Sequence, residues 1–157
     1  MNEKFSNKLL DDFPQLFRNR HETSMQRGFE CGDGWFDLIY KLAQDIETIA
    51  IESGLNPDSP EWPLCRQVKQ KFGSLRFVVF GINALSGMHE RISELRNDAL
   101  DRSLKICEYC GKPADLADDV RTTTMCTEHT RQAAIDPEFL PPFQLGKYRI
   151  DGNSDKP

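Results

Sequence analysis

The chain has 157 residues, of which 38% are hydrophobic and 29% are charged, and its formal net charge is −5. This composition is typical of a soluble globular protein, and the negative charge argues against general nucleic-acid affinity, which requires a basic field. No apolar run approaches the roughly 18 residues of a membrane span, and the first residues lack the apolar segment of a secretory signal. We therefore expect a cytoplasmic protein without a membrane segment.

The first twenty residues mix large apolar side chains with charged ones, and Pro14 interrupts any continuous helix. This pattern predicts a short helix and a turn, after which Phe13, Leu16 and Phe17 dock on the core.

Residues 28–35 read G-F-E-C-G-D-G-W, and three glycines within seven positions indicate a tight, specific backbone path. We expect Asp33 to cap the helix that follows. The glycines do not form G-x-G-x-x-G, which argues against a phosphate cradle. Glu30, Asp33 and Asp37 could also be paired catalytic carboxylates, although a cap and solvated acids explain them more simply.

Two long amphipathic helices are expected in the central part of the chain. The first begins at Phe36, has apolar residues at helical spacing, and ends at Gly54. Three prolines within residues 55–64 exclude a helix in the connector that follows. The second helix is predicted over residues 82–106, where its apolar stripe comprises Ile82, Leu85, Met88, Ile92, Leu95, Ala99 and Leu104.

Residues 65–81 lie between the two helices and have the pattern of a β-hairpin. Gly73-Ser74 is a suitable two-residue turn, and this turn would place Phe72 opposite Leu75 and Lys71 opposite Arg76. The core face would then comprise Val68, Phe72, Leu75, Phe77 and Val79.

The other face of this hairpin would carry Lys69, Lys71 and Arg76, with Arg66 nearby. Like charges that lie directly opposite each other destabilise a sheet, so an acidic group is expected close by, in the fold or on a partner. A solvated outer face and a nucleic-acid contact both remain open for these residues.

A pair of short clamps near the C-terminal end has the spacing of a metal site. The sequence reads C-E-Y-C at Cys107–Cys110 and, after fifteen residues, C-T-E-H at Cys126–His129. Three thiolates and one imidazole fill the tetrahedral coordination of Zn²⁺, which predicts one structural zinc ion per chain. The helix that presents the second clamp is expected over Thr127–Ile135, because Pro137 limits it.

Five cysteines and no secretory signal argue against a disulfide framework. We expect Cys31 and Cys65 to be buried thiols.

The last segment is apolar among prolines and predicts an extended tail, whose final residues 151–157 should be disordered. It could pack on its own domain, on a second copy in a homodimer, or on a partner. The apolar residues are Phe139, Leu140, Phe143, Leu145, Tyr148 and Ile150. The candidate partner-binding residues are Lys69, Lys71, Arg76, Phe139, Phe143 and Tyr148.

These elements predict an α+β protein with two long amphipathic helices, a β-hairpin, a Cys3His zinc site of the treble-clef or zinc-ribbon kind, and an extended tail. The expected organisation is a helical and hairpin core over residues 1–106, a zinc module over 107–135 packed on it, and the tail over 136–157.

The chain resembles a family of small, largely uncharacterised phage and prophage proteins. The residues that carry the resemblance are F-P-Q-L-F, G-F-E-C-G-D-G-W-F-D-L-I, Q-V-K-Q-K-F-G-S-L-R-F, C-E-Y-C-G-K-P and M-C-T-E-H. Val78 stands where similar members carry an aromatic residue, and the Trp that many have between the clamps does not occur here. The resemblance implies a phage accessory protein that acts in the bacterial cytoplasm, and it supplies no activity.

A closed metal site, an acidic chain and an apolar tail favour a non-catalytic protein that binds a host or phage protein, where inhibition of a host defence system would fit. The alternative is a nucleic-acid-binding regulator that uses the basic hairpin face. A nuclease of the HNH kind is disfavoured, because zinc would occupy His129 and leave only the remote His21 and His89. A zinc deaminase is disfavoured because its H-x-E and P-C-x-x-C signature is absent.

Overall fold

The computed structural model describes residues 1–80, 87–114, 123–136 and 139. In chain order the elements are α1 (Glu3–Asp12), the 3-10 turns η1 (Arg20–Glu22), η2 (Ser24–Arg27) and η3 (Asp33–Trp35), α2 (Phe36–Glu52), β1 (Leu64–Lys71), β2 (Ser74–Phe80), α3 (Met88–Ser103) and α4 (Thr127–Ile135). The predicted α+β class is therefore confirmed. None of the described helices is both long and apolar enough to cross a bilayer.

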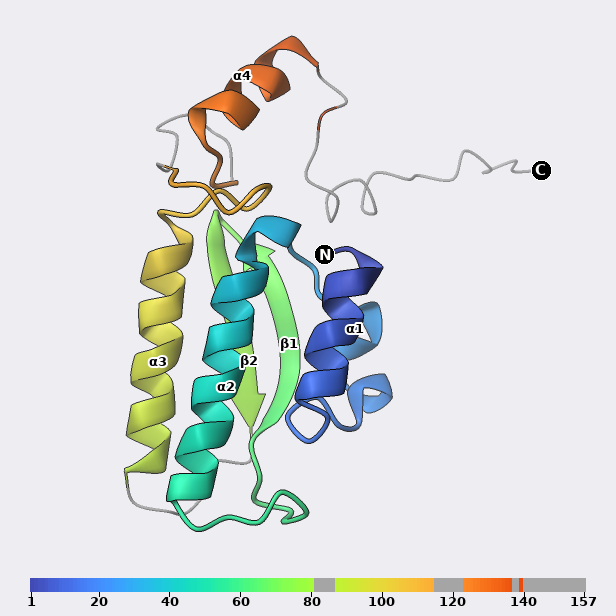
Figure 1. The fold of residues 1–157 in the computed structure, drawn as a ribbon, viewed down its shortest axis with the longest axis vertical. Coiled ribbons are helices and arrows are strands. Elements are labelled where there is room, and N and C mark those ends of the chain that lie inside the picture. The colour runs from blue at the N-terminus through green and yellow to red at the C-terminus, as the bar shows by residue number, and fades with distance from the viewer. Residues whose placement is uncertain (81–86, 115–122, 137–138, 140–157) are drawn as a thin grey trace, which may run out of the picture.

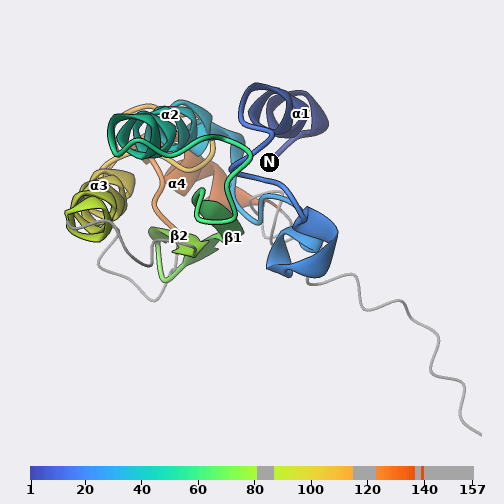
Figure 2. The same cartoon turned by 90° about the horizontal axis from the view of Figure 1, so that it is seen from below.

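The hairpin β1–β2 forms one layer, and α2 and α3 lie side by side across one of its faces (Figures 1 and 2). Helix α1 runs along the edge of this second layer, next to α2. The inner side of α2 fills the space between the layers with buried apolar side chains, as its helical spacing predicts. These residues are Leu38, Ile39, Leu42, Ala43, Ile46 and Ile49.

The N-terminal segment docks as the sequence predicts. After α1 the chain turns at Pro14, and Phe13, Leu16 and Phe17 are buried in the main hydrophobic core. The ring of Phe17 meets the rings of Phe29 and Phe77 edge-on, at centroid separations of 5.3 Å and 6.4 Å. Such edge-to-face contacts stabilise a core beyond the area they bury.

The predicted hairpin register is wrong, because the turn lies one residue earlier than expected. Lys71 pairs with Ser74 and Lys69 with Arg76, so the two-residue turn is Phe72-Gly73. Both turn residues have positive φ, +53° at Phe72 and +76° at Gly73, which is the pattern of a type I′ turn. Left-handed φ is unfavourable for a phenylalanine, so the turn depends on stabilising contacts. Within the hairpin, the Ser74 hydroxyl donates to the Lys71 carbonyl at 2.9 Å.

Two contacts from distant segments hold the turn in this register. The hydroxyl of Thr124 donates to the Gly73 carbonyl at 2.7 Å, and the Leu75 N–H donates to the Ser103 hydroxyl at 2.8 Å. The observed pairing differs from the predicted one by two residues, and a two-residue slide keeps every strand side chain on its face. Hence the predicted core residues Val68, Leu75, Phe77 and Val79 are buried, whereas Phe72 is 70% exposed.

Two expectations about the helix ends also need correction. Asp33 does not cap α2, because its carboxylate accepts the backbone N–H and the amide Nδ2 of Asn2, at 2.6 Å and 2.7 Å. Helix α2 instead continues from η3 without a side-chain cap. Helix α3 is described from Met88 and ends at Ser103, so it is shorter than predicted at its C-terminal end, and residues 82–86 lie outside the described residues.

Candidate metal centre

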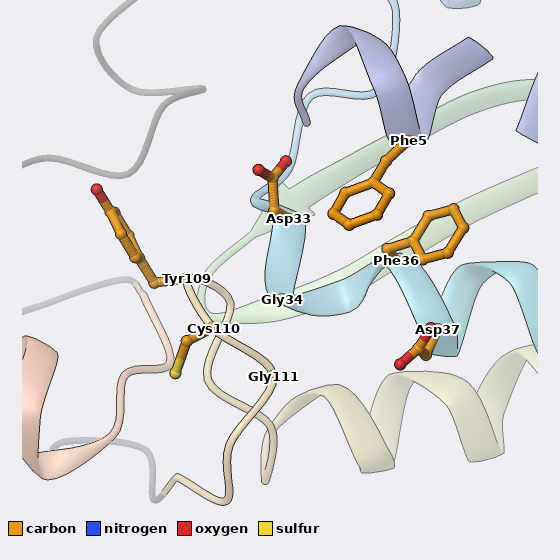
Figure 3. A pocket seen from close by; sticks show the side chains of 8 residues that line it. All are labelled: Phe5, Asp33, Gly34, Phe36, Asp37, Tyr109, Cys110 and Gly111. Carbon is orange, nitrogen blue, oxygen red and sulfur yellow. The ribbon is translucent and has the colours of Figure 1, made fainter. Parts of the chain in front are cut away.

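The turn at residues 32–35 packs directly on the first cysteine clamp, as Figure 3 shows for Gly34, Cys110 and Gly111. The Gly34 N–H donates to the Glu108 carbonyl at 2.9 Å, and the indole Nε1 of Trp35 donates to the Ile106 carbonyl at 2.9 Å. These bonds join the start of α2 to the segment that carries Cys107 and Cys110.

Glycine is required at two positions of this contact because the two backbones almost touch. A Cβ on Gly32 would lie 2.2 Å from the Glu108 carbonyl oxygen, and one on Gly34 would lie 2.2 Å from the Cys107 carbonyl oxygen. Real side chains do not fit at such separations. The tight path that the glycine-rich sequence indicates is therefore the path along which the core meets the clamp.

The carboxyl group of Glu108 is fully buried in the same contact. Its Oε1 accepts the Gly32 N–H at 2.9 Å, while its buried Oε2 has no partner among the described residues. Burial raises the pKa of Glu108 to about 8, against the smaller opposing effects of the Gly32 N–H and the terminal ammonium. Burial therefore favours the protonated form of this side chain near neutral pH, and no local sequence pattern indicates that burial.

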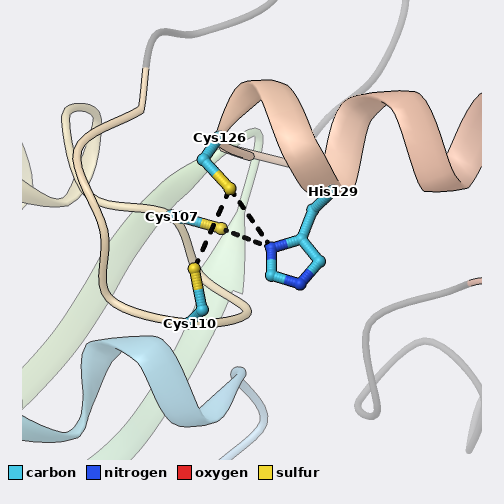
Figure 4. Close-up of side chains that lie close together, drawn as sticks. All are labelled: Cys107, Cys110, Cys126 and His129. Carbon is cyan, nitrogen blue, oxygen red and sulfur yellow. Dashed lines mark hydrogen bonds between the residues drawn. The ribbon is translucent and has the colours of Figure 1, made fainter.

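The four predicted ligand residues come together at one point (Figure 4), and their ligand atoms all lie within 4.8 Å of one another. The Nδ1 atom of His129 lies 3.3 Å from Sγ of both Cys107 and Cys126, and the sulfurs of Cys110 and Cys126 are 3.8 Å apart. In the described part of the chain, this is the one group of three or more side chains that could hold a metal ion.

These separations match those of ligands around a tetrahedral ion. Metal–sulfur bonds of about 2.3 Å at tetrahedral angles put two sulfurs about 3.8 Å apart, as Cys110 and Cys126 are. A disulfide would need about 2.05 Å, and all five cysteines are free. The donor set therefore fits one tetrahedral metal ion.

Local backbone structure explains how each clamp is formed. In the first, the Cys107 N–H donates to the Lys112 carbonyl and the Gly111 N–H donates to the Cys107 carbonyl, both at 2.8 Å, with Gly111 at φ +76°. In the second, Cys126 is the N-cap of α4, whose bounds Thr127–Ile135 are those predicted. Residues three apart on a first helical turn face the same way, so Cys126 and His129 both point toward the first clamp.

The surroundings adjust the acidity of these ligands. Desolvation acts to raise the pKa of Cys126, but the His129 N–H, the side chains of Cys107 and Cys110, and the Glu128 N–H together lower it. Burial raises the pKa of Cys107 to about 11 and lowers that of His129, which keeps the imidazole in its neutral, ligating form. A bound metal would displace the Cys107 proton, so affinity should rise with pH.

Aromatic rings cover one side of the candidate centre. The ring of Tyr109 lies 4.4 Å from that of His129 and 4.8 Å from that of Phe139, measured between centroids, and the Phe139 ring is stacked parallel to the imidazole at 5.7 Å. The start of the predicted tail therefore packs on its own chain. Phe143 and Tyr148 lie outside the described residues.

A pocket of about 380 Å³ lies beside the first clamp, between it and the starts of α1 and α2 (Figure 3). Its lining includes the rings of Phe5, Phe36 and Tyr109 and the carboxylates of Asp33 and Asp37. The two aspartates, which are candidate carboxylates by sequence, therefore share one pocket with these aromatic rings, and no sequence pattern indicates this proximity.

The remaining candidate residues are distributed as follows. Lys69, Lys71 and Arg76 share one hairpin face, as predicted. His21 and His89 are exposed.

The two cysteines outside the clamps are buried, and desolvation raises the pKa of the thiols of Cys31 and Cys65, as expected of inert core thiols. Glu30 pairs with Arg27 at 3.5 Å and does not line the pocket of Asp33 and Asp37, so the three predicted carboxylates do not act as one group.

Comparison of the chain with protein-family models, with curated proteins and with solved structures finds no match.

Proposed function

We propose that the Cys3His group holds one structural zinc ion, and that the chain is a non-catalytic accessory protein which binds another protein. The observation that carries the proposal is the closed donor set. Cys107, Cys110, Cys126 and His129 supply all four ligands of a tetrahedral ion, so no position remains for a catalytic water.

The zinc ion would support the fold rather than perform chemistry. It would join α4 to the clamp at Cys107–Cys110, and that clamp is already bound to residues 32–35 through Gly34 and Trp35. Metal binding is folding free energy in such sites, because the ligand cluster does not exist in the unfolded chain.

The pocket beside the clamp supports a protein partner with a basic side chain at the contact. Aromatic walls from Phe5, Phe36 and Tyr109 suit the hydrocarbon stem of a lysine or arginine, and Asp33 and Asp37 suit its charge. Neither aspartate forms an ion pair with a described residue. The resemblance to phage and prophage proteins adds the expectation that the partner is a host or phage protein whose activity is inhibited or redirected.

Metal analysis of the purified protein tests the first half of the proposal. We expect one zinc ion per chain and metal–sulfur distances of about 2.3 Å by X-ray absorption. A metal-free folded protein, or a Cys107–Cys110 disulfide, would contradict it.

Partner capture from host lysate, followed by mass spectrometry, tests the second half. Asp37→Lys should lose a partner that the parent protein retains, because it reverses the charge of the pocket. Asp11→Lys makes the same change on the exposed side of α1, away from the pocket, and should retain the partner. Equal capture by both variants would show that the pocket is not the contact.

A further inference from the structure

The hairpin concentrates positive charge in an otherwise acidic chain. Residues 64–80 contain four basic residues and no acidic ones, although the whole chain has a net charge of −5. The rest of the molecule is therefore more negative than the chain as a whole. Such segregation creates a local basic field that the net charge conceals.

Helices α2 and α3 cover one face of the hairpin, and no described helix covers the other (Figure 2). Arg66, Lys71 and Arg76 are exposed, and they alternate along the strands with the buried residues of the inner face. Lys69 and Arg76 are directly opposite each other there, and Lys71 follows two residues along the same strand. A β-bulge between Cys65 and Gln67 leaves Arg66 outside the strand pairing. Its side chain lies beside the Phe80 ring and adds a fourth cation to this face. The bulge could not be predicted from the sequence alternation.

Two phenylalanines are exposed at opposite ends of this face. Phe72 in the turn is 70% exposed and Phe80 at the end of β2 is 51% exposed. Each has a cation beside it: Lys71 Nζ lies 5.2 Å from the Phe72 centroid, and Arg66 Cζ lies 4.8 Å from the Phe80 centroid. A phenylalanine that served the hydrophobic core would be buried, not exposed to water beside a cation.

The charges on this face are not neutralised within the described residues. Lys69 and Arg76 form no ion pair there, although like charges opposite each other destabilise the hairpin. Glu30 is the acidic residue at the edge, bridged to Lys69 through the backbone, but its carboxylate lies 3.5 Å from Arg27. A ligand with negative charge would relieve the repulsion.

We infer that this basic–aromatic face, comprising Arg66, Lys69, Lys71, Phe72, Arg76 and Phe80, binds single-stranded nucleic acid. The cations would contact phosphates, and the two rings would stack on bases. A single strand fits better than a duplex, because a duplex hides the base faces on which the rings would stack. The inference concerns a different surface from the pocket beside the clamp and does not depend on the proposed protein partner.

The spacing of the rings sets the expected length of the site. Phe72 and Phe80 are eight residues apart along β2 and its turn, which is about 27 Å at the rise of a strand. A stacked single strand advances about 3.4 Å per nucleotide, so roughly eight nucleotides reach from one ring to the other. Shorter oligonucleotides can contact only one ring.

Fluorescence anisotropy with the zinc-loaded full chain tests the inference. The probes are labelled oligo-dT and oligo-rU of about four and about twelve nucleotides, and a duplex of the longer length, at about 50 mM and about 200 mM salt. We expect the longer single strands to bind best and to lose roughly 50-fold in affinity over this salt range, as four phosphate contacts require. The DNA and RNA probes decide which single strand is preferred.

Two variants with matched controls assign the binding to this face. Phe72→Ala should weaken binding by roughly fivefold or more without changing the salt slope, because it removes a stacking ring. Lys71→Glu should weaken binding and lower the slope. Ile51→Ala, which truncates an exposed apolar residue on α2, and Lys4→Glu on α1 should leave both unchanged.

Three outcomes would overturn the inference. The first is no binding at low salt. The second is a duplex bound as tightly as the single strand together with an unaffected Phe72→Ala variant, because base stacking would then play no part. The third is loss of a captured acidic protein by the Lys71→Glu variant while no oligonucleotide binds, which would assign the face to a protein instead.

Discussion

The junction between residues 32–35 and the first clamp differs from the outer face of the hairpin in almost every physical respect. At the junction two backbones meet without room for a Cβ, and the Glu108 side chain is fully buried. On the outer face, Phe72 and the cations around it are open to solvent. Both regions lie close together at the end of the hairpin, since Thr124 joins the clamp region to Gly73.

This difference indicates that the junction serves the stability of the fold and that the outer face serves binding. A change at the junction removes hydrogen bonds and packing that the fold needs, whereas a change on the outer face removes charges that the fold tolerates rather than uses. Variants of the two regions should therefore fall into two classes, one that unfolds and one that folds normally but loses its ligand.

The largest expected effect is loss of the metal. Cys110→Ser removes one of the four ligands of the proposed zinc ion, and structural zinc in small sites contributes on the order of 10 kcal/mol of apparent free energy. We expect the region after Leu104 to lose order, and the junction to loosen with it, as hydrogen exchange would detect. A chelator should produce the same change in the parent protein and no further change in Cys110→Ser. Unaltered protection after both treatments would contradict a structural metal.

The next largest effect is expected from Gly34→Ala. The new Cβ would lie 2.2 Å from the Cys107 carbonyl oxygen, so the clamp or the start of α2 must move, at a cost of about 3 kcal/mol or more. In a chain of this size that corresponds to a fall in Tm of roughly 10 °C.

Gly54→Ala is the control, because no atom lies within 4 Å of its added Cβ and only the positive φ of +80° opposes it. It should cost about 1–2 kcal/mol. Equal losses for the two variants would mean that the junction is not close-packed.

An effect that is smaller for each pH unit concerns the titration of Glu108. Glu108 is more acidic in the unfolded chain than in the folded protein, where burial raises its pKa to about 8. As pH rises, the unfolded chain therefore loses this proton before the folded protein does. The contribution of Glu108 to the free energy of unfolding is fully present below about pH 4.5 and falls as pH rises toward 8, by at most about 1.4 kcal/mol per pH unit.

Glu108→Gln removes this titration and keeps an oxygen that can accept the Gly32 N–H. Denaturant unfolding of the zinc-loaded protein at several pH values should show a flatter profile between pH 5 and 8 for the variant. Because binding of the proposed metal should strengthen with rising pH in both proteins, the difference between their profiles is the quantity to compare. Identical profiles would show that Glu108 is solvated.

The sequence predicted best what depends on short spacing. Local geometry positions the two ligands within each clamp, and α4 begins directly after Cys126, so that Cys126 and His129 lie on one helical turn. The helical stripe of α2 was likewise recognisable, since burial of one face imposes its period.

What the sequence could not predict depends on contacts between distant segments. The hairpin turn was misplaced because Thr124 and Ser103, far along the chain, hold Gly73 and Leu75. Asp33 was expected to cap its own helix, but Asn2 takes its carboxylate. In each case local propensity offered two acceptable structures, and a tertiary hydrogen bond selected one.

The smallest expected effect on stability concerns the outer face, where one substitution should stabilise the fold and weaken ligand binding. Arg76→Glu places a carboxylate directly opposite Lys69, which replaces a repulsive pair with an attractive one and should stabilise the hairpin by about 0.2–1 kcal/mol. The same change should abolish the phosphate contact that Arg76 makes in the proposed site.

A double-mutant cycle checks the register of the hairpin. The coupling energy between Arg76→Glu and Lys69→Ala should be larger than the coupling energy between Arg76→Glu and Lys71→Ala, because Lys71 is only a diagonal neighbour of Arg76. Stronger coupling of Arg76 to Lys71 would place the turn at Gly73-Ser74. If Arg76→Glu destabilised the protein by more than about 1 kcal/mol, the outer face would contribute to the stability of the fold, and the division into a structural junction and a binding face would be wrong.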